Sequence, residues 1–329
     1  MRRIATIGFF DGVHKGHKYL FKQLDRIGAE RVLEPFIVTF EEHPRVTLQS
    51  DYVPQLLTSA DERKSLLSAF GEVLMLPFKE IQPLTALQFM ERLHNDYGVD
   101  VLLMGYDHRF GSDRLRHPQD YRRLGKKIGL EVMTINEFVD GELHVSSTEI
   151  RAALESGNVA VANDLLGRPY SLKGQVVHGK AVGRTIGFPT ANIKPTDAHK
   201  IIPKAGVYAV LARAYGLEWS PAMLNIDHQG TIEVHIPSFE GDLYGQTVEL
   251  KFMRFIREEK HFDTLEALRE QIKADADSIL RRALRPPVRG RLYPEDRELP
   301  EGCPPRLSPD SMSPNENRNK RIPCIYRNP

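Results

Sequence analysis

The order of expected elements changes once along the chain, near residue 170, and this change constrains the fold more than any other feature. Before it, short apolar runs alternate with amphipathic helical segments. Alternating strands and helices indicate an α/β fold with a doubly wound parallel sheet. The expected strands are 2–8, 35–40, 73–76, 99–105 and 130–135, with helices expected within 17–28, 59–71, 85–98 and 118–128.

From Tyr170 onward the helical period disappears. Short β-like runs punctuated by glycine and proline replace it, at 171–177, 206–212, 231–236 and 247–252. Such runs predict a small antiparallel barrel or sandwich. One closing helix is expected, capped by Asp263 with Glu266, with an apolar stripe made of Leu265, Leu268, Ile272, Ala276 and Ile279. We therefore expect two domains, at residues 1–168 and 169–285.

Residues 286–329 have a different composition and hold ten of the chain's 22 prolines. Apolar residues are sparse there, so the segment cannot bury enough surface to offset the entropy of ordering it. We interpret it as a disordered proline-rich tail. An interaction tail and a sequence carried past a natural end near residue 285 are both compatible with the pattern, and we favour a tail without catalytic function.

The totals describe an ordinary globular chain. It has 329 residues, is 41% apolar and 27% charged, and carries a formal net charge of +1, which gives no overall field toward nucleic acid or membranes. No stretch has the length of a membrane span. The only cysteines, Cys303 and Cys324, lie in the tail, which favours a cytoplasmic location. We expect no nucleic-acid or membrane partner, and we allow for a weak homo-oligomer.

Residues 8–17, G-F-F-D-G-V-H-K-G-H, follow the first expected strand and precede the first expected helix. His14 and His17 lie three residues apart, so both can reach one pocket near the helix start. Backbone N–H groups at a helix N-terminus favour an anion, and two imidazoles can donate to phosphoryl oxygens. A plain glycine-rich turn is the alternative. A zinc site is less favoured because no third ligand is suitably spaced.

Several motifs together resemble a known family. H-x-G-H after a first strand resembles the nucleotidylyltransferase superfamily, and I-G-F-F-D-G-V-H-K-G-H resembles the start of the bacterial bifunctional riboflavin kinase / FAD synthetase family. The resemblance continues through F-E-E-H-P (40–44), G-Y-D-H-R-F-G (105–111), V-S-S-T-E-I-R (145–151) and L-L-G-R-P-Y (165–170). Two residues depart from the family pattern: Phe9, where asparagine is frequent, and Glu42, where proline is usual.

For the first module the resemblance implies a nucleotidylyltransferase domain that transfers AMP from ATP to FMN. His14 and His17 would stabilise the α-phosphate. The residues implied to bind ATP or its phosphates are Gly8, Phe10, Asp11, Gly16, Ser147, Thr148 and Arg151, and those implied to contact the flavin are Asp107 and Phe110. Ser146 with Glu149 also forms a capping-box pattern, which by itself predicts a helix start there.

In the second half, G-Q-V-V-H-G-K-A (174–181) nearly matches a phosphate-binding Walker A loop. Ala181 replaces the required hydroxyl and no helix follows, so we reject that interpretation. G-R-T-I-G-F-P-T-A-N-I (183–193) instead resembles the riboflavin kinase signature, although alone it could be a proline turn. The resemblance implies a β-barrel kinase in which Thr190 and Asn192 hold Mg²⁺. It further implies phosphate contacts from Gly183 and Arg184 and flavin contacts from Phe188 and Arg257.

Glu233 is the candidate base for the kinase reaction, because the family places a glutamate in a Glu-x-His strand. Glu233 and His235 share one face of that strand, opposite Ile232 and Val234. The alternative is an exposed polar face of an edge strand. The connection at residues 227–230 is shorter than the family's and lacks its Arg-Pro-Thr element, which puts full kinase activity in doubt.

Three functional hypotheses follow. The leading one is a bifunctional enzyme that phosphorylates riboflavin to FMN and adenylylates FMN to FAD, with ATP as co-substrate and Mg²⁺ as cofactor. The second is an FMN adenylyltransferase whose C-terminal module binds flavin with weak or no kinase activity. The third is a non-catalytic flavin-binding or regulatory protein that uses its tail to bind a partner. Intact motifs in both modules argue against the third.

Overall fold

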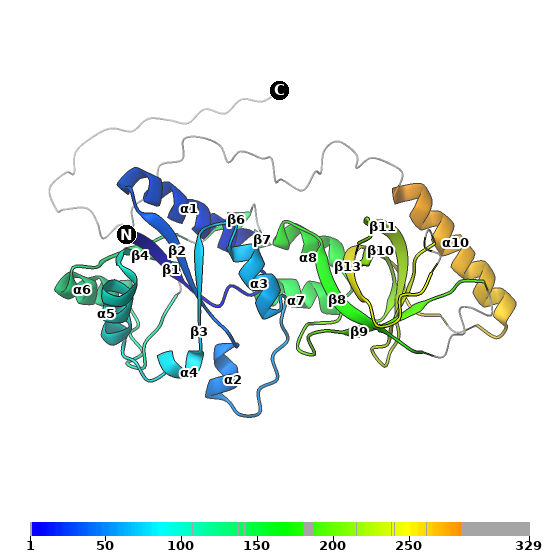
Figure 1. Cartoon of the computed structure of the whole chain (residues 1–329), viewed down its shortest axis with the longest axis horizontal. Coiled ribbons are helices and arrows are strands. Elements are labelled where there is room, and N and C mark those ends of the chain that lie inside the picture. The colour runs from blue at the N-terminus through cyan, green and yellow to red at the C-terminus, as the bar shows by residue number, and fades with distance from the viewer. Residues whose placement is uncertain are drawn as a thin grey trace, which may run out of the picture. The chain divides into compact units, whose positions relative to one another are not determined.

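The structure is a computed structural model that describes residues 2–283 apart from 107, 137, 141–142, 180–186, 215, 238, 240 and 261. The expected tail, with both cysteines, lies outside the described residues. The described residues all belong to one compact unit. Within it, a parallel sheet with flanking helices is followed along the chain by a closed barrel, as Figure 1 shows.

The first half is a five-stranded sheet in the order β3-β2-β1-β4-β5, and every neighbouring pair is parallel. The predicted doubly wound sheet is therefore confirmed. Its strands are β1 (Arg3–Ile7), β2 (Glu34–Phe40), β3 (Glu72–Leu76), β4 (Val99–Met104) and β5 (Glu131–Thr134). Its helices are α1 (Lys15–Arg31), α2 (Pro44–Leu48), α3 (Ala60–Leu67), α4 (Phe78–Ile81), α5 (Ala86–Tyr97) and α6 (Pro118–Ile128).

Helices cover both faces of this sheet because successive strand residues point to opposite sides. On β1, Ile4 packs in one cluster with α1 and α3, while Ala5 and Ile7 pack in another with α5 and α6. The apolar stripe of α1 is fully used: Leu20, Phe21, Leu24 and Ile27 are all buried. This double cover leaves the carboxyl ends of the strands and the loops after them as the place for a site.

Two helices connect the sheet to the barrel. A short hairpin of β6 (Val139–Asp140) and β7 (Leu143–His144) leads into α7 (Ser147–Glu155) and α8 (Val159–Leu166). Ile150, Leu154 and Leu166 share one hydrophobic cluster with barrel residues such as Tyr170 and Phe252. The two helices are thus packed as part of the barrel's core, and the domain boundary near 168 stays a prediction.

The second half forms the barrel rather than the sandwich. The strands are β8 (Tyr170–Val177), β9 (Ala191–Pro195), β10 (Gly206–Ala214), β11 (Ser220–Ile226), β12 (Ile232–His235) and β13 (Thr247–Arg257), closed in the order β10-β11-β12-β9-β8-β13. All described pairs are antiparallel. The inward positions of β8 alternate, and Gly174 takes one of them because a Cβ there would lie 2.3 Å from the Ile193 side chain.

The closing helix, α10 (Leu265–Ala283), corrects one expectation. Its first turn is capped by Thr264, whose Oγ1 accepts a hydrogen bond from the Ala267 N–H at 3.2 Å, and not by Asp263. Because the helix begins at Leu265, that side chain lies on the first turn and is 54% exposed instead of joining the apolar stripe. Ala276 and Ile279 are buried, as predicted.

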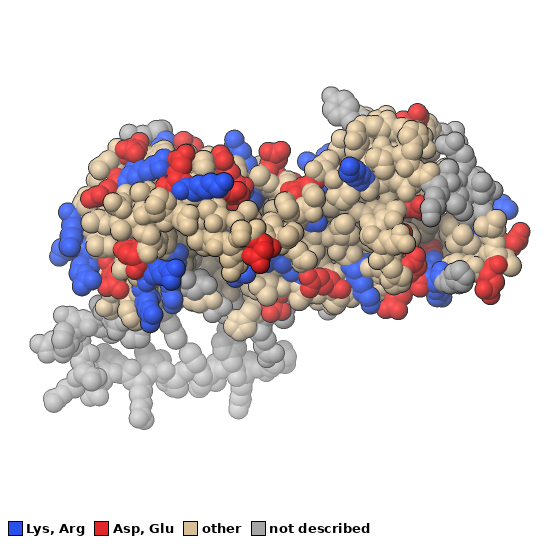
Figure 2. Space-filling model, turned by 90° about the horizontal axis from the view of Figure 1, so that it is seen from below, with Lys and Arg blue, Asp and Glu red and all other residues tan. Residues whose placement is uncertain are grey.

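Basic and acidic side chains are interspersed over the face shown in Figure 2, in keeping with the near-zero net charge. Among the helices that the structure describes, none combines the length and hydropathy needed to cross a membrane.

Candidate active site

The loop between β1 and α1 has an unusual backbone. Phe10 and Val13 have positive φ angles of 55° and 43°, and Gly12 lies between them with φ of 82°. For a β-branched residue such as Val13 this conformation costs about 1–3 kcal/mol, and it persists only where the surroundings enforce it. The loop follows the central strand, at the carboxyl edge of the sheet where α/β folds bind ligands.

Asp11 holds this loop in place through its side chain. Its buried carboxylate accepts hydrogen bonds at 3.0 Å from the backbone N–H groups of Leu57 and Thr58 and from the Thr58 hydroxyl. The Thr58 Oγ1 in turn accepts from the Gly12 N–H at 3.1 Å. The carboxylate also forms an ion pair with Arg151 of α7 at 2.5 Å. Asp11 therefore joins three segments that are far apart in sequence.

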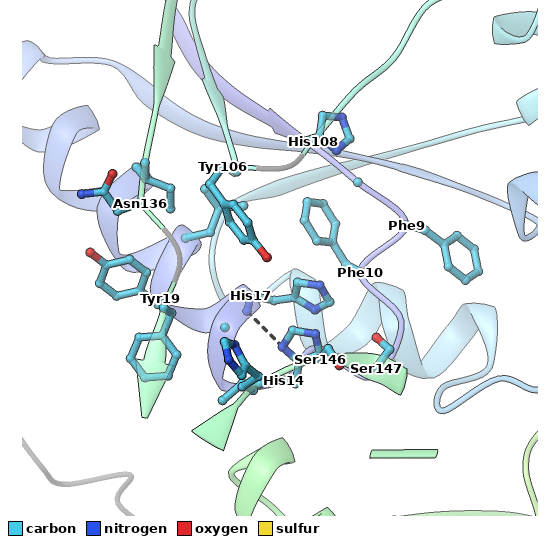
Figure 3. A pocket seen from close by; sticks show the side chains of 18 of the residues that line it. Phe9, Phe10, His14, His17, Tyr19, Tyr106, His108, Asn136, Ser146 and Ser147 are labelled. Atoms are coloured by element: carbon cyan, nitrogen blue, oxygen red, sulfur yellow. Dashed lines mark hydrogen bonds between the residues drawn. The ribbon is translucent and has the colours of Figure 1, made fainter. Parts of the chain in front are cut away.

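His14 and His17 lie together at the start of α1 (Figure 3). His14 is the N-cap residue, and its Nδ1 accepts a hydrogen bond from the His17 N–H at 3.3 Å. The two imidazole rings are stacked, with centroids 3.6 Å apart and planes at 19°. The ring of Phe10 contacts the His17 ring edge-on, at 5.2 Å between centroids.

Both imidazoles are neutral at neutral pH. Burial lowers the pKa of His14 to about 3, and the cations of Arg168 and Arg151 contribute to the shift. Burial, His14 and Arg168 hold the pKa of His17 well below its usual value. Because Nδ1 of neutral His14 accepts the capping bond, its proton lies on Nε2, which can donate. The buried Nδ1 of His17 has no hydrogen-bond partner within the described structure.

A cavity of about 290 Å³ opens beside this histidine pair. Aromatic side chains form much of its wall, and Tyr19 stacks on Phe138 at 5.2 Å. Figure 3 shows Tyr19 and Tyr106 around the cavity together with His14 and His17. An aromatic wall beside a helix N-terminus suits a ligand with a planar ring and a phosphate group.

A second cluster of polar residues lies on the barrel. Asn192 of β9 and Glu233 of β12 are direct cross-strand neighbours. Beside them, Nδ1 of buried His235 donates to the Pro189 carbonyl at 2.8 Å, which fixes the turn that carries Thr190. Since β12 pairs with both β11 and β9, Glu233 is not on an edge strand. Asn192 and Glu233 are thus neighbours, and Thr190 precedes Asn192 by two residues. Hydroxyl, amide and carboxylate oxygens are the ligands that a hard cation such as Mg²⁺ prefers.

Comparisons with known proteins match both modules. A FAD synthetase family model matches residues 1–149, and a riboflavin kinase family model matches residues 166–283. The bifunctional riboflavin kinase/FMN adenylyltransferase of Escherichia coli K12 is 35% identical over 283 residues, covering 83% of this chain and 90% of the relative. That of Bacillus subtilis is 32% identical over 298 residues, covering 85% and 92%.

The chain belongs to the bifunctional riboflavin kinase/FMN adenylyltransferase family. A solved structure from Streptococcus pneumoniae, described as a macrolide-efflux protein, is similar with a TM-score of 0.77 and 32% identity, covering 85% of this chain and 94% of that one. The likeness therefore spans both the parallel sheet and the barrel.

The structure of this family member brings together many of the residues singled out in the first module. The cavity is lined by six of them: Gly8, Phe10, His14, Gly16, His17 and Ser147. Asp11 and Arg151 do not line it, because they are bound to each other behind the loop. Thr148 is exposed at the start of α7, and the Phe110 ring packs against Phe89 and Tyr121.

In the kinase module, Phe188 contacts the His235 ring edge-on at 5.4 Å, near Thr190 and Asn192. Arg257 forms an ion pair with buried Asp275 at 2.7 Å and so attaches α10 to the barrel. Asp107, Gly183 and Arg184 lie outside the described residues, so their predicted roles stay predictions.

Sequence reasoning missed two groups of contributors. Thr58 supports the loop, but it belongs to no motif and acts only through partners 46 or more residues away. Tyr19 and Phe138 form the aromatic wall, and the aromatic residue two positions after His17 was the only local signal for it.

Proposed function

We propose that this protein makes FAD from riboflavin in two steps, phosphorylation of riboflavin to FMN and adenylylation of FMN by ATP. The observation that carries the proposal is the neutral, stacked His14–His17 pair at the N-terminus of α1, on the wall of an aromatic cavity. Membership of the family and the match of both family models support it. We further propose a cytoplasmic location, since the chain has the composition of a globular protein.

In the adenylylation step, a phosphate oxygen of FMN would attack the α-phosphorus of ATP, and pyrophosphate would leave. The Nε2–H of His14 donates to the α-phosphate, whose negative charge increases in the transition state. The partnerless Nδ1 of His17 gains a hydrogen-bond partner on binding. The proposal assigns Gly8, Phe10 and Gly16 to the approach of ATP, and Ser147 and Thr148 at the start of α7 to the leaving phosphates.

Asp11 and Arg151 act in this proposal through the loop. Their ion pair and the hydrogen bonds of Asp11 hold Phe10 and Val13 in their positive-φ conformations, which places His14. No covalent enzyme intermediate is required, because positioning and charge stabilisation suffice for an in-line displacement at phosphorus.

In the phosphorylation step, Glu233 would take the proton of the ribityl hydroxyl as that oxygen attacks the γ-phosphorus of ATP and ADP leaves. Asn192 lies opposite Glu233, and Thr190 lies on the turn fixed by His235. The oxygen donors of Thr190 and Asn192 fit Mg²⁺, which when bound would offset phosphate charge. Phe188 is assigned to the flavin ring, whereas Arg257 would act there while bound to Asp275.

A second candidate is an adenylyltransferase whose barrel binds flavin without phosphorylating it. The observation that favours it is the connection between β11 and β12. Residues 227–230 form a tight turn in which the Asp227 carboxylate accepts from the Gln229 and Thr231 N–H groups at 2.8 Å. The longer loop that the resemblance implies has no counterpart in this turn. We favour the bifunctional enzyme because Thr190, Asn192 and Glu233 are all present.

One assay separates the candidates. Riboflavin and Mg-ATP are supplied and the flavins are separated over time. The bifunctional enzyme forms FMN first, then FAD with pyrophosphate. If no FMN forms but added FMN is converted to FAD, the barrel is not a kinase. If added FMN is also left unchanged, the proposed function is wrong.

A further inference from the structure

The junction between the two modules reaches into the nucleotidyl-transfer site. Helix α8 ends at Leu166, and Gly167 follows as a left-handed C-cap with φ of 64°. The barrel side of this junction is fixed by buried Asn163, whose Oδ1 accepts from the Tyr170 N–H at 2.7 Å. Its Nδ2 donates to the Phe252 carbonyl of β13 at 2.8 Å. The junction is thus rigidly attached to the barrel.

The other side of the junction holds the histidine loop. Lys15 forms an ion pair with Asp164 at 2.9 Å, and Lys18 donates to the Gly167 carbonyl at 3.4 Å. Arg168 donates through Nη1 to the Val13 carbonyl at 3.3 Å. The three residues of the first module that make these contacts are Val13, Lys15 and Lys18. In the sequence they flank both His14 and His17.

Arg168 is the member of this set closest to the chemistry. Its contact is made to Val13, the residue with the unfavourable positive φ that directly precedes His14. Such a backbone needs external contacts to persist. The guanidinium also lies near enough to both imidazoles for its charge to lower the pKa of each. By contrast, Lys15 is paired with Asp164, whose side chain is 55% exposed, and exposed pairs contribute little.

We propose that Arg168 is a positioning residue for adenylyl transfer: from the module junction it holds the Val13 carbonyl and thereby sets the orientation of His14 and His17. This inference rests on the proposed adenylylation of FMN. It also makes the barrel part of the support for the transfer site, because Arg168 is fixed between α8 and β8.

The test compares Arg168→Gln, Arg168→Lys and the control Arg26→Gln, which alters an exposed pair on α1. For each variant, kcat and KM are measured for both reactions, and His14 and His17 are titrated by proton NMR. Arg168→Gln should lower kcat for FAD formation from FMN by about 100-fold, the effect of a misplacement near 1 Å, with KM for ATP within about threefold. FMN formation should stay within about twofold.

The histidine titrations give a readout besides activity, because Arg168 contributes to the lowered pKa of both histidines. Without the cation, the pKa of each histidine should rise toward its ordinary value. Arg168→Lys should restore the titrations and part of kcat, because the charge is kept and one donor remains. Arg26→Gln should match the unaltered protein in every measurement.

Two results would overturn the proposal: an unchanged kcat for FAD formation in folded Arg168→Gln, or an equal fall of both reactions. If Arg168→Gln does not fold, the Arg168→Lys variant is used instead. An unchanged kcat for FAD formation in Arg168→Lys, although the histidine pKa values differ from those of the unaltered protein, would also contradict the positioning role. Failure of the unaltered protein to adenylylate FMN would instead remove the proposed function, and the histidine titrations would still report on the contact.

Discussion

Arg151 on α7 forms a 2.5 Å ion pair with Asp11, 140 residues earlier in the sequence, and the Asp11 carboxylate is almost entirely buried. Arg151 also donates through Nε to the Gln55 carbonyl at 2.6 Å, and Ser147 donates to the Asp11 carbonyl at 2.9 Å. The segment 145–151, which the resemblance implies to contact phosphate, therefore also holds the loop that carries the histidines.

Asp11→Asn should be strongly destabilising. It keeps the side-chain shape but removes the charge that pairs with Arg151, and removing one partner of a buried pair costs about 3 kcal/mol. Urea unfolding should show this loss, and FAD formation from FMN should fall even at temperatures where the variant is folded. Glu30→Gln, at an exposed pair with Arg26, is the control and should change stability by less than about 0.5 kcal/mol. Equal stabilities of the two variants would contradict the anchoring role of Asp11.

The free energy of unfolding should decrease as the pH is lowered from about 7 to about 5, because of the buried histidines. In the unfolded chain a histidine takes up a proton near pH 6.5, whereas burial lowers the pKa of folded His14 to about 3. Only the unfolded state binds the proton in this range, so each such histidine lowers the unfolding free energy by about 2 kcal/mol between pH 7 and pH 5.

His14→Gln should make the fall in unfolding free energy between pH 7 and pH 5 smaller by about 2 kcal/mol than in the unaltered protein. Urea titrations at the two pH values measure it. The same substitution at exposed His117 is the matched control and should leave the fall unchanged. A fall of equal size in His14→Gln would show that His14 is not held neutral.

Local sequence patterns predicted the elements well where the responsible residues are neighbours. The capping boxes at Ser59–Glu62 and Thr85–Gln88 both form, and Gly98 ends α5 in the left-handed conformation with φ of 67°. The alternation of strands and helices was enough to predict the parallel sheet. The one-turn helices α2 and α4 were missed, because segments so short carry no period.

The chemistry of the site was only partly predictable. His14 and His17 could be found because they lie three positions apart, and both line one cavity, as expected. The role of Asp11 in holding the loop could not be found, because its partners Leu57, Thr58 and Arg151 come from distant segments that only the fold brings together. Similarly, no local pattern shows that Arg168 reaches Val13.

The division of labour between the modules predicts that His14→Ala combined with His17→Ala abolishes FAD formation and leaves FMN formation nearly intact. Removing one transition-state donor costs about 10²–10³ in rate, so the double variant should lose at least about 10³-fold. Product analysis after incubation with riboflavin and Mg-ATP should show FMN accumulating without FAD. His117→Ala should behave like the unaltered protein. If both reactions fell together in a folded double variant, the two sites would not be independent.

Glu233→Gln should have the opposite effect. The amide keeps the size of the side chain and its place opposite Asn192 but cannot accept the proton of the ribityl hydroxyl. A missing general base typically costs about 10²–10⁴ in rate, so FMN formation from riboflavin should fall by that factor, while FAD formation from added FMN stays within about twofold. Glu218→Gln, at an exposed position between β10 and β11, is the matched control for a lost carboxylate on the barrel. An unchanged rate of FMN formation in Glu233→Gln would assign the base to another residue.

The same assay also tests the short turn at residues 227–230. Formation of FMN by the unaltered protein would show that this turn is compatible with phosphoryl transfer.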